Sequence, residues 1–230
     1  MQYTDPAIDL SSFGRHNGFY DRQIKTFSKL SVDQANTKDV ETDKPVGPIP
    51  HFDEMIEFFR DKSRQPRDRS TLIHGDYKID NLVFHKTEPR VIGILDWEMA
   101  TIGHPLSDVV NLTGPWTWTG RSGSGDVKGN EHFEEGKTPG IPSLEQVIDW
   151  YVEESGYDVR KDLAWGNAFG GFRNSIIMQG IAARYAARQA SSQKAMDYGG
   201  AMRPQAEMAW DFVQDVMRRN EEAGVANSKL

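Results

Sequence analysis

The stretch from residue 74 to residue 98 constrains this chain more than any other part of its sequence. It begins with HGDYKIDN and ends with DWE, and short apolar runs lie between the two. Three short runs have the composition of β-strands. Thr71–Ile73 comes directly before the stretch, and Leu82–Phe84 and Arg90–Leu95 lie within it. Polar residues stand at the ends of these runs, with Asp76 after the first, Asn81 before the second and Asp96 after the third.

A turn at Thr87-Glu88-Pro89 would join the last two runs into a hairpin. In that hairpin Asn81 and Asp96 come to the same end. Mg²⁺ prefers carboxylate, amide and phosphate oxygens as ligands. Phosphoryl transfer uses such metal ions to neutralise charge, together with a carboxylate that orients the attacking hydroxyl. The spacing therefore predicts a site for phosphoryl transfer.

His74-Gly75-Asp76 with Asn81 five positions later, followed by Asp96-Trp97-Glu98, resembles the signature of the aminoglycoside phosphotransferase and choline kinase family, which is protein-kinase-like. The flanking residues are most similar to the phosphotransferase-like domain of acyl-CoA dehydrogenase family members 10 and 11. This likeness is carried by Phe13-Gly14-Arg15 and by the run from Gly103 to Asp108 as well. It extends over most of the chain and is most specific around the two motifs.

The resemblance implies a role for each acidic or amide residue of the two motifs. Asp76 would be the catalytic base or the group that orients the substrate hydroxyl. Asn81 and Asp96 would hold Mg²⁺ and, through it, ATP. Glu98 would reach a second metal ion through water or would make a structural hydrogen bond; both readings stay open.

The same resemblance assigns supporting roles. His74 is expected to fix the loop through hydrogen bonds rather than to exchange protons. Asp108 is expected to brace that loop from the helix that follows. Lys78 is expected to be a solvated lysine.

The expected fold class is α+β and mostly helical, a kinase-like C-terminal lobe (residues 1–225) with a small β-hairpin at the catalytic loop. Apolar periodicity predicts helices at Phe19–Ala35, His51–Arg64, His104–Leu112, from Ser143, at Asp162–Ala190 and after Pro204. Charged, proline-rich or glycine-rich composition predicts flexible loops at about 36–50 and 114–142.

A complete kinase also needs an N-terminal lobe that covers the ATP phosphates. The 73 residues before His74 contain neither G-x-G-x-x-G nor a strand with V-A-x-K, and the glycine-rich run Gly120–Gly125 fits neither phosphate-loop spacing. We expect the nucleotide lobe to be absent from this chain, its activity alone to be reduced, and an apolar face open to self-association or to a partner chain.

Three functions remain open from the sequence. The first is a phosphotransferase for a small-molecule alcohol, with a hydroxyacyl-CoA as the substrate that the resemblance implies. The second is a non-catalytic kinase-like lobe that binds an acyl-CoA or a protein partner. The third is a choline- or aminoglycoside-type kinase, for which the acidic loop at 114–135, with Trp116 and Trp118, could bind a cation.

Composition and the C-terminus restrict partners and location. The net charge is −7 with pI ≈ 5.4, so no overall field attracts nucleic acid or an anionic membrane. There are no cysteines, which excludes thiol catalysis and zinc–thiolate sites. The tail at 226–230 ends in Ser228-Lys229-Leu230, a peroxisomal address read by an import receptor. We expect a peroxisomal protein, with the cytoplasm as the alternative.

Overall fold

The computed structural model describes residues 10, 12–119, 131–190, 197 and 199–227, without the side chains of 220–227. The predicted address Ser228-Lys229-Leu230 and the run Gly120–Gly125 lie outside the described residues. No helix within the described ranges is both long enough and apolar enough to cross a membrane.

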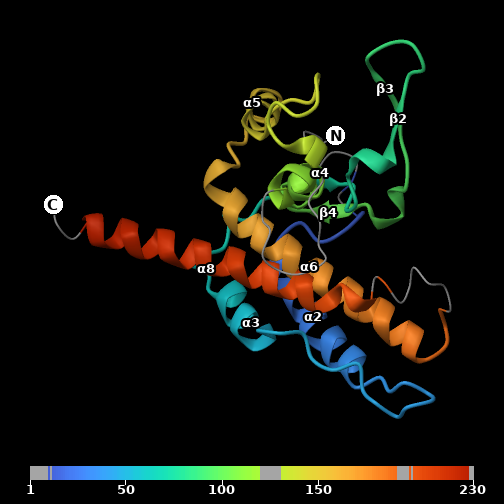
Figure 1. Ribbon diagram of the computed structural model, residues 1–230. Coiled ribbons are helices and arrows are strands. Elements are labelled where there is room, and N and C mark those ends of the chain that lie inside the picture. Colours follow the sequence, from blue (N-terminus) through green and yellow to red (C-terminus); the bar gives the residue numbers. More distant parts are fainter. Residues whose placement is uncertain (1–9, 11, 120–130, 191–196, 198, 228–230) are drawn as a thin grey trace. The chain divides into compact units, whose positions relative to one another are not determined.

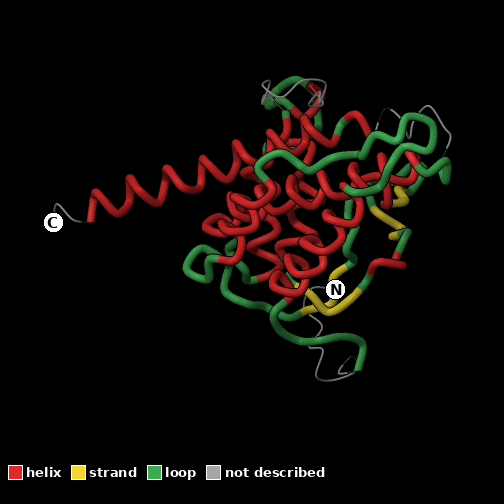
Figure 2. The backbone as a smooth tube through the Cα atoms, turned by 90° about the horizontal axis from the view of Figure 1, so that it is seen from below, coloured by secondary structure: helices red, strands yellow, loops and turns green. Residues whose placement is uncertain are grey.

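Helices make up most of the described chain, and the strands are short (Figures 1 and 2). The helices are α2 (Phe19–Ala35), α3 (Phe52–Arg60), α4 (Leu106–Trp118), α5 (Leu144–Ser155), α6 (Arg160–Ala186) and α8 (Met202–Asn227). The strands are β1 (Thr71–Ile73), β2 (Leu82–Phe84), β3 (Val91–Ile94) and β4 (Thr101–Gly103), and the 3₁₀ turns are η1 (Ile79–Asn81), η2 (Trp97–Met99) and η3 (Glu131–Phe133). The predicted mostly helical α+β class is confirmed.

The chain divides into two compact units. The first comprises residues 1–20, 67–121 and 129–166, and the second comprises 21–66, 122–128 and 167–230. All residues predicted to carry chemistry fall in the first unit.

Two antiparallel strand pairs frame the predicted catalytic loop. Strand β2 pairs with β3, with Leu82 opposite Ile94, which confirms the predicted hairpin. Strand β1 pairs with β4, with Ile73 opposite Thr101. Strand β4 was not predicted from the sequence, because three residues that follow a turn carry no alternating pattern. The two pairs hold the beginning and the end of the 74–98 stretch in place.

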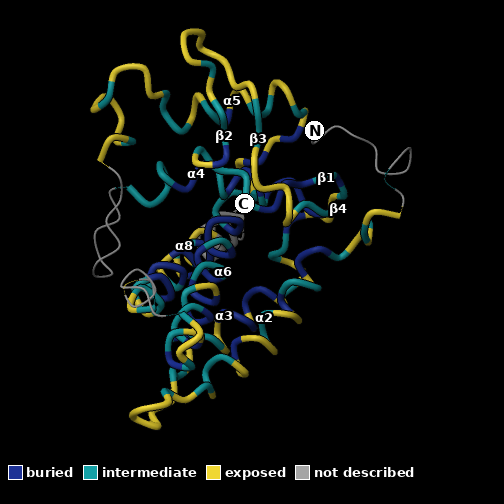
Figure 3. Tube along the Cα trace, turned by 90° about the vertical axis from the view of Figure 1, so that its right-hand side faces the viewer, coloured by how far each residue is buried: buried dark blue, intermediate teal, exposed yellow. Residues whose placement is uncertain are grey.

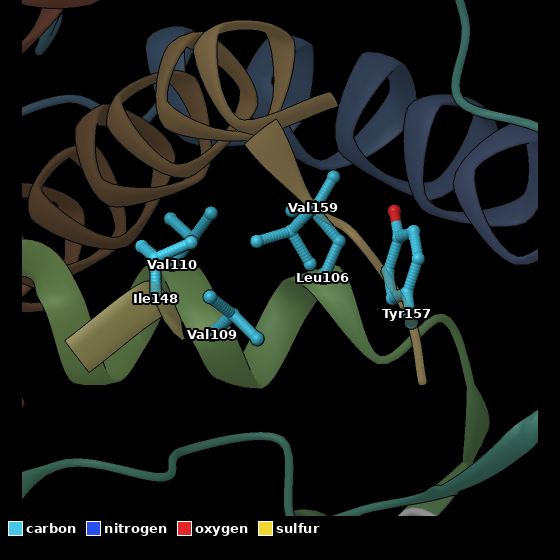
Figure 4. Packing of buried hydrophobic residues seen from close by; sticks show 6 residues of the cluster. All are labelled: Leu106, Val109, Val110, Ile148, Tyr157 and Val159. Carbon is cyan, nitrogen blue, oxygen red and sulfur yellow. The ribbon is translucent and has the colours of Figure 1, made fainter. Parts of the chain in front are cut away.

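The core of the first unit lies between α4, α5 and the segment after α5. It consists of Leu106, Val109, Val110, Ile148, Tyr157 and Val159, all at most 6% exposed (Figure 4). Helix α5 begins where predicted, because Ser143 accepts a hydrogen bond from the Gln146 backbone (3.2 Å) while the Gln146 side chain accepts one from the Ser143 backbone (2.9 Å). This capping box fixes the first turn of the helix that packs on α4.

The core of the second unit is aromatic. Phe59 of α3 meets Phe169 and Phe172 of α6 with ring centroids 5.1 and 5.2 Å apart. Gln179 is fully buried, and both polar atoms of its side chain form hydrogen bonds. The carbonyl oxygen accepts from Ser31 (2.8 Å), and the amide nitrogen donates to the Gly47 carbonyl (2.9 Å). Ser31, Gly47 and Gln179 thus tie α2, the loop after it and α6 together.

Two predicted loops are more regular than the sequence indicated. Helix α4 continues to Trp118 through Pro115, so residues 114–118 are helical rather than part of a loop. The last turns are held by Trp116, whose indole donates to the Pro142 carbonyl (2.8 Å) and whose ring packs on Phe133. These tertiary contacts offset the hydrogen bond that proline removes from a helix.

The 36–50 loop is likewise tied by hydrogen bonds. Asp39 accepts from the backbone N–H groups of Glu41 and Thr42 (3.0 and 2.9 Å) and pairs with Arg188 of the same unit (2.9 Å). The N–H groups of Thr42 and Glu41 lower the pKa of Asp39 to about 2. Helix α3 is shorter than predicted, because the backbone becomes extended at Asp61.

His104 makes the stability of the first unit pH-dependent. The side chain is fully buried, and its Nδ1 accepts from the Leu106 backbone (3.2 Å), so Nε2 carries the proton that it donates to the Arg67 carbonyl (3.2 Å). Burial lowers its pKa from 6.5. Below about pH 6.5 the histidine binds a proton in the unfolded chain, whereas in the folded chain it stays neutral until a lower pH. We therefore expect this histidine to make its whole contribution to the free energy of unfolding above about pH 6.5. Below about pH 6.5 the free energy of unfolding should fall as the pH drops.

Urea unfolding of wild type and His104→Gln at about pH 7.5 and about pH 5.5 measures this effect. His104 should change the free energy of unfolding by at most about 1.4 kcal/mol per pH unit. The exposed His132→Gln is the matched control and should keep the wild-type pH dependence. An identical pH dependence in His104→Gln and wild type would contradict the assignment.

Candidate active site

Asp108 in the first turn of α4 holds the beginning of the loop that follows β1. Its carboxylate is 3% exposed and accepts from the backbone N–H groups of His74 (2.7 Å) and Gly75 (2.9 Å). Asn111, one turn further along α4, donates to the Gly75 carbonyl (3.2 Å). Gly75 has φ +85°, and a Cβ there would lie 2.6 Å from the Met99 carbonyl oxygen. Only glycine fits this turn.

His74 joins the two motifs. The ring is nearly buried, and its Nδ1 accepts from the Asp76 backbone N–H (3.2 Å). Nε2 is therefore the protonated nitrogen, and it donates to the Leu95 carbonyl (2.7 Å). Trp97 packs against the ring at 4.7 Å between centroids. Both nitrogens of His74 are occupied in holding backbone, in the manner that the sequence analysis expected.

Asp76 and Asn81 are bonded to each other across the loop. The Asn81 side-chain nitrogen donates to the Asp76 carbonyl (2.8 Å) and to Asp76 Oδ2 (3.2 Å). Asn81 is buried at 5% exposure, whereas Asp76 is half-buried. Because the nitrogen of Asn81 is used, its Oδ1 is the atom that remains for a metal ion.

Lys78 is partly exposed to solvent, as expected, and also pairs with Asp76. Its ammonium lies 3.0 Å from Asp76 Oδ2, and its side chain is 43% exposed. The Asp–x–Lys spacing contained this signal, since two residues in an extended turn can point the same way. Lys78 therefore belongs to the immediate surroundings of Asp76.

The hairpin brings Asn81 and Asp96 to the same end, as predicted. The Asn81 carbonyl accepts from the Leu95 backbone N–H (2.8 Å), so Asp96 follows directly on a residue bonded to Asn81. Asp96 is exposed and has a left-handed backbone (φ 61°, ψ 51°), a conformation that Asp tolerates better than most residues. It lies after β3, directly before η2.

Glu98 lies in η2 and is exposed. Among the described residues, no three His, Asp or Glu side chains gather closely enough to hold a metal ion. A metal site here would therefore depend on the amide of Asn81 beside the carboxylate of Asp96. Amide and carboxylate oxygens are the donors that Mg²⁺ prefers, so these two residues fit that ion.

The aromatic residues proposed for a cation site have other contacts. Trp116 is bonded to Pro142 and packed on Phe133, and Trp118 packs against Gly114 of its own helix. Asp126, an acidic residue of the same 114–135 loop, lies outside the described residues.

Several apolar side chains are exposed on the β2–β3 hairpin and the turn after it. They are Phe84, Val91, Ile92, Leu95, Trp97 and Met99, with exposed fractions from 37% to 56%. Figure 3 colours the backbone of the hairpin mostly as exposed or intermediate. An apolar face that is open to self-association or to a partner chain stays a prediction.

Comparison with known proteins agrees with this geometry. The chain is 32% identical to acyl-CoA dehydrogenase family member 11 of Gallus gallus over 205 residues, 87% of this chain but 24% of that protein. It is also 32% identical to family member 10 of Mus musculus over 207 residues, 90% of this chain and 18% of that protein. The chain thus spans a quarter or less of the length of these relatives.

A solved structure has the same fold. It is a candidate aminoglycoside phosphotransferase from Ralstonia eutropha, with a TM-score of 0.75 and 32% identity, and the match covers 94% of this chain and 61% of that one. The sequence model of the phosphotransferase enzyme family matches residues 2–146, which include both motifs and α4. Because that match covers more than half of the 230 residues, the chain belongs to the phosphotransferase enzyme family.

Proposed function

We propose that this chain is an ATP- and Mg²⁺-dependent phosphotransferase that acts on a hydroxyl group of a small molecule. The proposal is supported by the hydrogen bond between Asp76 and Asn81 and by the β2–β3 hairpin, in which Asp96 follows the residue bonded to the Asn81 carbonyl. A carboxylate next to two oxygen ligands is the arrangement that phosphoryl transfer requires.

Asp76 is the group that meets the substrate hydroxyl. Asn81 and Lys78 both engage Asp76 Oδ2, so Oδ1 is the oxygen that accepts the hydroxyl proton. His74 holds the Asp76 backbone and therefore limits movement of this carboxylate. Positioning of this kind matters because a misplacement of ~1 Å can cost about 10² in rate.

Asn81 Oδ1 and the Asp96 carboxylate would hold the metal ion, and Glu98 would reach a second one through water. Bound Mg²⁺ would neutralise negative charge on the phosphates of ATP. Asn81 is kept in place by its two bonds to Asp76, so metal binding and hydroxyl orientation are coupled through one side chain.

The names of the relatives support a substrate class. Both full-length relatives are called acyl-CoA dehydrogenase family members, and this chain corresponds to a part of each. We take a hydroxyacyl-CoA as the acceptor to test first.

Asp96→Ala tests the metal site. The substitution removes one of the two proposed ligands from an exposed position, so the fold should persist while Mg²⁺-dependent ATP binding is lost. Calorimetric titration of ATP with and without Mg²⁺ measures this. Asp80→Ala is the control, since Asp80 is an exposed carboxylate in η1 and should leave binding unchanged. Unaltered Mg²⁺ dependence in Asp96→Ala would rule the ligand assignment out.

The tail directs the protein to peroxisomes in this proposal, with the import receptor as its partner. A fluorescent protein carrying Ser228-Lys229-Leu230 at its end should collect in peroxisomes, and deletion of Leu230 should leave it in the cytosol. A diffuse signal from the intact tail would leave the cytoplasm as the location.

A further inference from the structure

A cavity of about 510 Å³ lies in the first unit beside the catalytic loop. Most of its wall is apolar: Leu72 and Ile94 come from strands, Leu112 from α4, and Val147, Trp150 and Tyr151 from α5. Its volume falls within the range of small-molecule pockets, roughly 300–1,000 Å³. The core residues described above pack α4 against α5, and they leave this space unfilled.

The wall of the cavity is bonded directly to Asp76. His74 and Tyr77 both line it, and they flank Asp76 in the sequence. The Asp76 backbone N–H donates to His74 Nδ1 at 3.2 Å. A molecule in the cavity therefore touches the loop that presents the Asp76 carboxylate.

Two of the buried polar residues in the wall, Asp108 and His74, cannot serve a polar ligand without losing structural hydrogen bonds. Asp108 accepts from two backbone N–H groups, and both nitrogens of His74 are used. Breaking such buried bonds is costly, about 1–3 kcal/mol for each group left without a partner. Glu154 on α5 also lines the cavity and is exposed, so it disfavours an anionic occupant. An uncharged hydrocarbon group fits this wall best.

Trp150 gives an independent indication. Its side chain lines the cavity although 56% of the residue is exposed to solvent. An indole this exposed contributes little to the core, and a ligand that covers it gains apolar contact area. Tyr151 is adjacent on the same helix and is partly covered.

We propose that this cavity binds the hydrocarbon part of the acceptor alcohol, and that Leu112 and Trp150 determine which acceptors fit. The inference rests on the proposed function, because it assumes that the hydroxyl lies at Asp76. It predicts that acceptors are selected by the size of their apolar part.

Binding is measured with the neutral apolar dye N-phenyl-1-naphthylamine, displaced by 1-butanol, 1-hexanol or 1-octanol. We expect the dye to fluoresce on binding, and each added methylene to strengthen displacement about fourfold. Leu112→Trp puts a larger side chain into the cavity and should weaken dye and 1-octanol binding at least about tenfold. Ile177→Trp, which adds the same indole at an exposed position of the second unit, should bind like wild type.

Trp150→Ala is the second variant, since Trp150 is exposed and its removal should leave the fold intact. It should weaken 1-octanol binding about fivefold to tenfold. Wild-type binding in both Leu112→Trp and Trp150→Ala, with unchanged circular dichroism, would overturn the assignment.

Activity separates this inference from the proposed function. Asp76→Asn should bind the dye and 1-octanol like wild type while failing to transfer phosphate. If wild type transfers phosphate but Leu112→Trp leaves KM for apolar acceptors unchanged, the cavity assignment is wrong and the phosphotransferase stands. If the alcohols displace the dye and no acceptor is phosphorylated, the proposed function is wrong, and with it the acceptor role of the cavity.

Discussion

Asp76→Asn is expected to lower kcat for phosphoryl transfer by at least ~10³-fold while leaving the fold intact. The side-chain amide of the variant cannot accept the proton of the substrate hydroxyl, the role that we assign to Asp76 Oδ1. It can still accept from the Asn81 side chain, so the hydrogen bond across the loop survives. The ion pair with Lys78 is lost, but both partners are partly exposed and little stability depends on it.

Steady-state turnover of hydroxyacyl-CoA at saturating Mg²⁺–ATP measures this effect, with ADP and the phosphorylated product followed together. Asp80→Asn is the matched control, because it makes the same chemical change at an exposed site four residues further on. A normal kcat in Asp76→Asn would show that Asp76 is not the hydroxyl-orienting group. Absence of turnover in wild type, with ATP binding retained, would favour a non-catalytic lobe.

Asp108→Ala should be the most destabilising single substitution in the site. It leaves the buried N–H groups of His74 and Gly75 without their acceptor, and each such group costs about 1–3 kcal/mol. We expect a loss of roughly 3–5 kcal/mol, a large part of the 5–15 kcal/mol typical of a folded domain. The loop that carries Asp76 should loosen at the same time.

Urea or thermal unfolding measures the loss, and hydrogen exchange at His74 and Gly75 reports the loop. The control is Asp149→Ala on α5, an exposed carboxylate whose partner is Arg160. It should change the free energy of unfolding by no more than about 0.5 kcal/mol. Equal effects of the two substitutions would mean that Asp108 is only a surface charge.

Local pattern was sufficient for several parts of this protein. The apolar spacing of residues 19–35 predicted α2 with its observed bounds, and the Ser143–Gln146 capping box marked the beginning of α5. The alternation of apolar runs and a turn predicted the β2–β3 hairpin, and hence that Asn81 and Asp96 share one end. These features depend on residues a few positions apart, so a sequence displays them directly.

The tertiary structure decided what depends on residues far apart in the chain. Strand β4 exists because β1, some thirty residues earlier, pairs with it, and α4 reaches Trp118 because Pro142 and Phe133 hold its last turn. The protonated nitrogen of His74 and the cavity beside Trp150 appear only once the chain is folded. The sequence by itself determined which groups we propose for phosphoryl transfer, because that chemistry needs particular residue types at a set spacing. Their positions depend on hydrogen bonds such as that from His74 to Asp108, which close loops of more than thirty residues and leave no periodic trace in the sequence.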